Sequence, residues 1–138
     1  MSYYWVKYSD RLPEQFGGLA SGPLIRIRPK YKDDTGLIEH EKTHVRQWYA
    51  AMAIGFLLSA LLTLLVSNSV FPLFGLAPLL HQLLYKFVRP YRCWCEVKAY
   101  RKQIAIGGYL SNDFAVKALI EKYYLKLSAD EARALLFD

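Results

Sequence analysis

The dominant pattern in this sequence is a long apolar segment between two polar parts. Residues 47–85 contain no Asp, Glu, Lys or Arg, a window of 39 positions. Within it, residues 48–66 form a 19-residue apolar run, which as a helix is long enough to cross a bilayer core of about 30 Å. A polar turn at residues 67–69 precedes a second apolar stretch, residues 70–88, which two prolines interrupt. The pattern predicts a hydrophobic helical hairpin over residues 48–88.

The N-terminal part of the chain has a pattern typical of short strands and loops. Leu24, Ile25 and Ile27 alternate with basic residues, which predicts a short strand that has one apolar and one basic side and ends at Pro29. Residues 16–23 (FGGLASGP) are rich in glycine and predict a turn-rich loop. We therefore expect a small β element before the first helix.

Helices are predicted on both sides of the hairpin. Asp33, Asp34 and Thr35 are candidate caps for a helix that begins near Gly36. The helices expected after the hairpin cover residues 91–106, which Gly107 and Gly108 stop, 111–127, and 128–137, where Ser128 and Glu131 form a capping-box pair. The predicted fold class is mainly α with a small N-terminal β element.

The length of 138 residues favours a single domain. Its parts would be residues 1–35 (strand and loop), 36–47 (first helix), 48–88 (hairpin) and 89–138 (C-terminal helices). The net charge of +6 is compatible with an anionic partner, either nucleic acid or an acidic membrane surface. The N-terminus lacks a signal-peptide pattern. Cys93 and Cys95, only one residue apart, indicate free thiols in a reducing compartment.

The charges around the hairpin favour insertion into a membrane. Basic residues flank both ends, namely Lys42 and Arg46 before it and Lys86, Arg89, Arg92, Lys98, Arg101 and Lys102 at its end and after it. By the positive-inside rule, both ends then lie on the cytoplasmic side. The alternative is a cytoplasmic protein, with two buried helices or with a hairpin that packs into a larger assembly. A chain this short cannot easily bury two such helices on every side, which favours membrane association.

A candidate metal site lies at the entrance to the hairpin, in the sequence HEKTH. His40 and His44 are four residues apart, so in a helix both imidazoles lie on one face and can bind one ion. Glu41 is placed to accept a proton from a water molecule that Zn²⁺ activates, without itself being a ligand. The alternative is a pair of surface histidines without a metal.

Catalytic zinc usually has three protein ligands, so one more is needed. His81 lies inside the hairpin, where we expect it to be far from His44. Glu96 begins the sequence EVKAYRK on the helix that follows the hairpin. Because a hairpin that leaves and returns brings this helix back beside His44, Glu96 is the expected third ligand.

HEKTH followed by Glu96-Val97-Lys98-Ala99 resembles the gluzincin metallopeptidases, and most closely the group of the CAAX prenyl proteases, the heat-shock membrane endopeptidases and the minigluzincins. The resemblance covers about residues 24–102. It implies a zinc-dependent endopeptidase whose HExxH helix and glutamate helix are joined by a hydrophobic hairpin, with His40, His44 and Glu96 as ligands and Glu41 as base. It also implies that a substrate strand adds to an edge strand above the first helix, for which the strand carrying Ile25 and Ile27 is the candidate.

Two further residues are candidates for supporting roles. Gln47, three residues after His44, could orient a ligand, although a plain surface glutamine is the alternative. Tyr100 stands where the family usually has Asp, so a supporting contact is missing or replaced. Tyr100 could hold the Glu96 carboxylate or donate to an oxyanion in the transition state, and a packing role is the alternative.

The main functional hypothesis is a membrane-associated zinc endopeptidase with a protein or peptide substrate and its active site on the cytoplasmic side. The alternative is a non-catalytic basic protein that binds a membrane or a partner and has a structural or vestigial zinc site. Nucleic-acid binding is disfavoured, because no recognised motif supports it. Glu41 separates the first two hypotheses, since a structural site has no use for a base.

Overall fold

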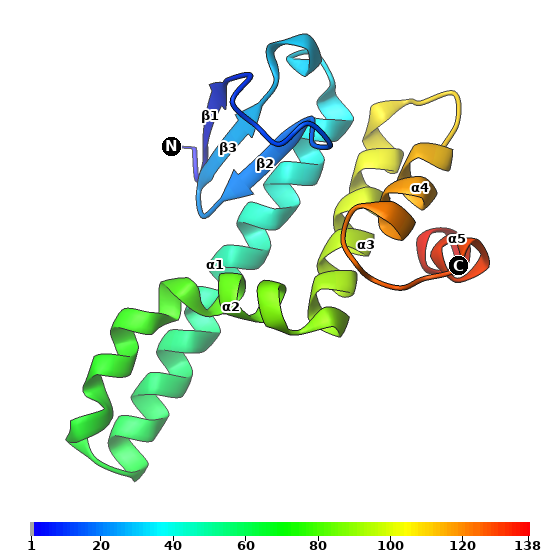
Figure 1. Ribbon diagram of the computed structural model, residues 1–138. Helices are drawn as coiled ribbons and strands as arrows, with labels where there is room; N and C mark the ends of the chain where they lie inside the picture. Colours follow the sequence, from blue (N-terminus) through cyan, green and yellow to red (C-terminus); the bar gives the residue numbers. More distant parts are fainter. Residues whose placement is uncertain (1) are drawn as a thin grey trace.

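The N-terminal part of the chain forms a small three-stranded sheet (Figure 1). The computed structural model describes residues 2–138. The strands are β1 (Trp5–Tyr8), β2 (Gly18–Ser21) and β3 (Leu24–Ile27), in the order β1-β3-β2. Strand β1 is parallel to β3, whereas β2 is antiparallel to it. A short 3₁₀ helix, η1 (Pro29–Tyr31), follows β3.

The predicted strand is present, but its place in the sheet differs from the expectation. Strand β3 is the central strand, with both of its edges paired, so Ile25 and Ile27 cannot receive an added substrate strand. Both side chains are fully buried and pack with Val45 of the first helix. The loop expected at residues 16–23 contains strand β2, because Gly22 (φ 57°) turns the chain so that β2 pairs with β3.

Helix α1 (Thr35–Leu65) is one continuous helix of 31 residues. Its cap is one of the predicted residues: the Asp34 carboxylate accepts a hydrogen bond of 2.8 Å from the Leu37 N–H. The HEKTH motif lies in the first turns of this helix, and the first apolar run forms the rest. The motif and the apolar arm are therefore joined without a break in the backbone.

The expected helical hairpin projects away from the rest of the molecule (Figure 1). Its first arm is the second half of α1. Its second arm consists of a 3₁₀ segment, η2 (Asn68–Leu79), and of α2 (Leu80–Phe87). Pro72 and Pro78 lie inside η2, and because proline lacks an N–H it disfavours a regular α-helix there. The two arms are in close contact at Gly55, where an added Cβ would lie 2.9 Å from the Ala77 Cβ.

Two helical segments, Thr35–Leu65 and Asn68–Phe87, are long and apolar enough to span a membrane. Within their most apolar stretches, only 17% and 11% of the residues are buried in the protein. A core helix of a water-soluble fold is mostly buried, so the burial of these segments differs from that of a protein core.

Three further helices, α3 (Arg89–Gly107), α4 (Asp113–Glu121) and α5 (Ala129–Phe137), complete the chain. Helix α3 ends at Gly107, and the next residue, Gly108, has the left-handed conformation that stops the helix, as predicted. Helix α5 begins with the predicted capping box. Helix α4 ends six residues before the expected position, since the chain leaves helical geometry there and Tyr124 has a positive φ of 53°.

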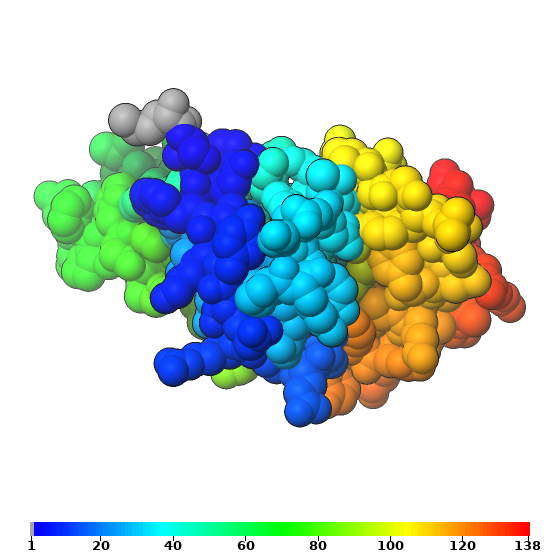
Figure 2. Space-filling view, turned by 90° about the horizontal axis from the view of Figure 1, so that it is seen from above, coloured from blue at the N-terminus to red at the C-terminus, as the bar shows by residue number. Residues whose placement is uncertain are grey.

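The site lies between two small cores. In one core the sheet packs on α1, and in the other α4 and α5 pack on α3. Helices α1 and α3 lie against each other, and seen from above the start of α1 separates the sheet from the C-terminal helices (Figure 2). Both cysteines, Cys93 and Cys95 of α3, are free thiols, as expected.

Candidate metal centre

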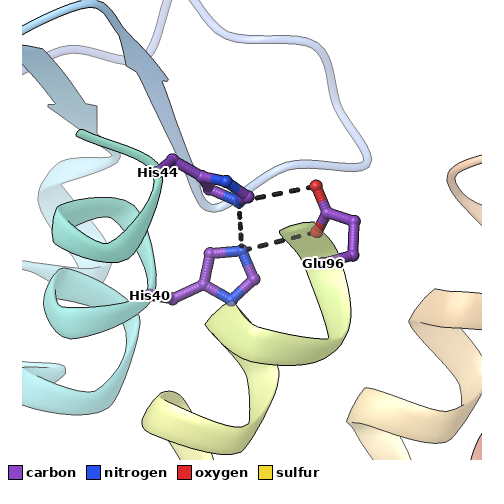
Figure 3. Close-up of side chains that lie close together, drawn as sticks. All are labelled: His40, His44 and Glu96. Carbon is purple, nitrogen blue, oxygen red and sulfur yellow. Dashed lines mark hydrogen bonds and ion pairs between the residues drawn. The ribbon is translucent and has the colours of Figure 1, made fainter. Parts of the chain in front are cut away.

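The three predicted ligands converge where α1 and α3 are in contact (Figure 3). His40 and His44 project from successive turns of α1, and Glu96 reaches them from α3. The two Nε2 atoms are 3.1 Å apart. The Glu96 carboxylate oxygens lie 3.6 Å from His40 Nε2 and 3.4 Å from His44 Nε2. This cluster could hold a metal ion.

The separations within the cluster are compatible with a small metal ion. Ligand atoms bound tetrahedrally to an ion such as Zn²⁺ at about 2.0–2.1 Å lie about 3.3 Å from one another. The two Nε2 atoms are 3.1 Å apart, and the carboxylate approaches them through different oxygens, Oε2 at 3.6 Å from His40 and Oε1 at 3.4 Å from His44. Within residues 2–138, the buried Oε2 atom of Glu96 has no hydrogen-bond partner, and a nearby cation would satisfy it. Two imidazoles and one carboxylate form a known catalytic zinc set, which leaves a fourth position open.

One glutamine supports a histidine from behind. The Gln47 Oε1 atom accepts a hydrogen bond of 2.9 Å from His44 Nδ1 when that nitrogen carries its proton. The Gln47 amide donates to the Cys95 carbonyl at 3.1 Å and so joins α1 to α3. Gln103 of α3 lies near His40 and raises the pKa of that imidazole, but within residues 2–138 neither its Oε1 atom nor His40 Nδ1 has a hydrogen-bond partner, and its amide donates to the Tyr109 hydroxyl. Gln47 was predicted from its spacing, whereas the nearness of Gln103 was missed.

His40 is held as a neutral imidazole. Burial lowers its pKa well below the ordinary value, because the imidazolium loses hydration, and the neighbouring His44 lowers it further. The side chain is only 4% exposed. A neutral imidazole is the form that binds a metal, so His40 does not have to lose a proton before it becomes a ligand.

Glu41 is buried beside the cluster, on the side of strand β2. Its pKa is raised to about 8, chiefly by burial and then by the negative charge of Glu96, while the backbone N–H of Ala20 opposes the shift. Gly18 of β2 makes room for it, since an added Cβ would lie 2.8 Å from Glu41 Oε1. The sheet therefore fixes the position of this carboxyl group next to the candidate ligands.

Three tyrosines surround the glutamate and histidine ligands. Tyr85, at the end of the hairpin, donates a hydrogen bond to Glu96 Oε1. The Tyr100 ring packs edge-on against His40, with ring centres 4.5 Å apart, and its hydroxyl lies 2.9 Å from that of Tyr123. The role of Tyr100 as an oxyanion donor stays a prediction. Tyr85 and Tyr123 were missed, because neither is at a helical spacing from the motif residues.

His81 lies closer to the site than expected. The prediction that it is far from His44 is wrong, because both residues border the same cavity. The return of the hairpin places α2 beside the start of α3, so the His81 Nδ1 atom lies 2.9 Å from the Tyr91 hydroxyl. His81 is not part of the cluster of three candidate ligands.

Two cavities meet at the metal centre. The larger, of about 620 Å³, lies toward the end of the hairpin and has His44 and Glu96 in its wall. The smaller, of about 350 Å³, lies toward the start of α1. Glu41, His40 and Tyr123 border both cavities. A chain bound across the site would therefore have space on either side of the candidate base.

Comparisons of this chain with models of known families, with curated proteins and with solved structures give no significant match. The function is therefore inferred from the geometry of the site.

Proposed function

We propose that this protein is a zinc-dependent endopeptidase that acts at a membrane surface. The observation that carries the proposal is the convergence of His40, His44 and Glu96, whose candidate ligand atoms lie within 4.8 Å of one another, with the buried carboxyl of Glu41 beside them. The resemblance of both sequence motifs to the gluzincin peptidases supports the same conclusion.

A zinc ion at this site would act as a Lewis acid toward a peptide carbonyl and would lower the pKa of a water molecule. Glu41 accepts the proton of the attacking water and then delivers it to the leaving amine. Strand β2 holds the Glu41 carboxyl group beside the candidate ligands, because its Oε1 atom fits against Gly18. Gln47 keeps the Nε2 atom of His44 directed at the site.

Strand β2 is the proposed docking edge for a substrate strand. It is an edge strand, and Gly18, Leu19 and Ala20 border the larger cavity beside the metal centre. A peptide that pairs with β2 would pass close to Glu41, which contacts both Gly18 and Ala20. The added strand is thus proposed for β2 and not for Ile25 and Ile27 of β3.

The proposed location follows from the charges at the base of the hairpin. The apolar arms expose many large side chains. Basic residues flank the arms, namely Lys42, Arg46, Lys86, Arg89 and Arg92. With the arms in the bilayer, the positive-inside rule places these residues, and the metal centre between them, on the cytoplasmic side. A segment close to the membrane is then the natural substrate.

The competing function is a non-catalytic protein that binds a membrane or a partner assembly through the exposed hairpin and has a structural zinc site. A structural site normally has four protein ligands, whereas the described residues supply three at this cluster. The two functions differ in what they require of Glu41, since only hydrolysis depends on a base.

The test is hydrolysis of unfolded protein substrates by the zinc-loaded chain in detergent micelles, compared with Glu41→Gln. We expect the variant to retain zinc and to lose activity by at least about a hundredfold, since general acid–base catalysis contributes about 10²–10⁴. Glu39→Gln is the matched control, because Glu39 lies on the same helix and pairs with Lys42 and Arg46. Equal activity in Glu41→Gln and the parent would contradict the proposal.

A further inference from the structure

We propose that the cleft selects peptides that carry a carboxylate next to a bulky apolar side chain, with Lys122 as the carboxylate anchor. This inference rests on the proposed peptidase function and names its substrate class. The carboxylate can be an acidic side chain or the C-terminus of the peptide, since both present the same group to an ammonium.

Lys122 stands where the two cavities meet. It follows directly on helix α4 and borders both cavities, as Glu41 and His40 do. A group bound by the Lys122 ammonium would therefore lie next to the reacting peptide bond.

The position of Lys122 is fixed by its neighbour in the chain. The Tyr123 carbonyl accepts a hydrogen bond of 3.0 Å from the Arg92 guanidinium, and the Tyr123 hydroxyl lies 2.9 Å from that of Tyr100. The Tyr123 ring also packs near Phe16 on the opposite side of the cleft, with ring centres 5.9 Å apart. These contacts hold the loop after α4 against α3, so the ammonium is presented from an ordered backbone.

Two charged groups of the larger cavity already have partners. Arg92 donates to the carbonyls of Tyr85, Lys86 and Tyr123, and Glu96 faces the histidines. Lys86 and Lys122 also border this cavity and form no ion pair with any of residues 2–138, and of the two only Lys122 borders the smaller cavity as well. The other side chains in the wall of this cavity are mostly aromatic and aliphatic, and they include those of Phe16, Leu19, Ala20, Tyr85 and Tyr124. With about 620 Å³, this cavity has room for a large apolar side chain.

The smaller cavity has a different character. Arg28 donates to the carbonyls of the loop before β2 at 2.7–3.1 Å, and Asp34 caps α1. Glu14 and Lys30 are exposed at its rim and have opposite charges. Lys122 is half-buried and forms no ion pair with any of residues 2–138. A half-buried ammonium without a partner favours a carboxylate from the ligand.

The experiment measures peptide binding by the full-length, zinc-loaded Glu41→Gln variant in detergent micelles, so that no cleavage interferes. Fluorescent octapeptides with one Phe and one adjacent Glu are compared with the same peptides in which Glu is replaced by Gln. A second pair compares a C-terminal free acid with its amide, which separates the two sources of the carboxylate. In at least one of the two pairs, we expect the Kd of the peptide that carries the carboxylate to be about tenfold lower than that of its uncharged counterpart.

Lys122→Met in the same background should abolish that preference, and Lys122→Glu should reverse it in favour of a peptide with Lys in place of Glu. Lys117→Met is the control, because Lys117 is exposed on α4 and borders neither cavity. Equal Kd values for both members of both pairs, a preference that survives Lys122→Met, or no binding of any peptide would overturn the proposal. Hydrolysis by the parent is scored separately, so a preference without cleavage would refute only the peptidase function.

Discussion

At the scale of single residues, the metal centre depends on how its two imidazoles are oriented. Gln47 bonds to His44 from behind, whereas Gln103 of α3 lies near His40 without a hydrogen bond to it. A partner such as Gln47 fixes the tautomer and the ring orientation, so that the Nε2 lone pair is directed at the ion before it binds. Gln103 also connects through Tyr109 to Asp34, the cap of α1.

Gln47 should therefore matter for affinity although it is not a ligand. We expect Gln47→Leu to weaken zinc binding by about 10–100-fold, which is the usual effect of removing such a partner. Competition with a zinc-binding dye measures the change. Gln15→Leu is the control, because this glutamine is exposed and far in sequence from the ligands. Unchanged affinity in Gln47→Leu would show that the His44 imidazole is oriented in another way.

Gly18 tests the position of the base. A methyl group at this position would lie 2.8 Å from Glu41 Oε1 and 2.8 Å from Ile27 Cδ1, so Gly18→Ala should displace the Glu41 carboxylate. We expect zinc to be retained and hydrolysis to fall by at least about tenfold, since a misplaced base transfers protons poorly. Gly75→Ala, where nothing lies within 4 Å of the added Cβ, should behave as the parent. Full activity of Gly18→Ala would place the base elsewhere.

The central residues of the site could be predicted from sequence because they follow local rules. Helical spacing pairs His40 with His44, and the return of a hairpin brings Glu96 back to them. Tyr85 and Tyr123 could not be predicted in this way, because their contacts with Glu96 and Tyr100 depend on where α2 and the loop after α4 lie in space. Gln103 lies two turns after Glu96 on α3, a signal that spacing could have revealed.

At the scale of elements, the hairpin depends on small residues where its arms touch. Ala51, Gly55 and Ser59 lie four residues apart on α1 and are buried, and Ala77 of η2 packs against Gly55. Small residues at this spacing let two helical backbones approach closely, which is the usual device for packing helices in a lipid environment. The remaining large side chains of the arms are then free to face outward.

A bulky residue at this contact should separate the arms. Gly55→Leu is expected to lower the stability of the hairpin by about 1–3 kcal/mol or more, because an overpacked contact must be relieved by moving backbone. The apparent Tm in detergent micelles measures the effect. Ala53→Leu adds the same side chain on the exposed side of α1 and should leave the Tm unchanged. Equal Tm values for the two variants would contradict this packing.

The order of helices was predictable because caps and glycines mark their ends, as Asp34, Gly108 and Ser128 do. The place of β3 within the sheet was not, since periodicity predicts a strand but not its neighbours. Strand β2 was overlooked because its four residues, Gly18–Ser21, have low strand propensity and form a strand only by pairing with β3.

At the scale of the whole molecule, residues 2–138 form two small hydrophobic cores and an apolar arm that neither core covers. Leu57 and Leu64 of α1 are 71% and 83% exposed, and many other large side chains of the arms are exposed too. Monomeric soluble proteins rarely leave an apolar surface of this size uncovered. The candidate metal centre lies at the base of the arm, where α1 contacts α3.

Membrane binding by the arm can be tested with vesicles. We expect the parent chain to float with phospholipid vesicles and the double variant Leu57→Arg, Leu61→Arg to remain largely unbound, since each arginine at mid-membrane costs about 2.5–3.5 kcal/mol. Ile106→Arg, an exposed apolar position at the end of α3, is the control and should still float. Flotation of the double variant to the same extent as the parent would contradict insertion of the arm.

The most direct test of the central claim is the amount of zinc per chain, measured for the parent and for Glu96→Ala after purification without chelator and with zinc supplied. The account predicts about one zinc ion per chain in the parent and a large loss in Glu96→Ala, while Glu121→Ala, which removes an exposed carboxylate, keeps the ion. A parent without zinc, or a Glu96→Ala variant that retains it fully, would contradict a site built from His40, His44 and Glu96.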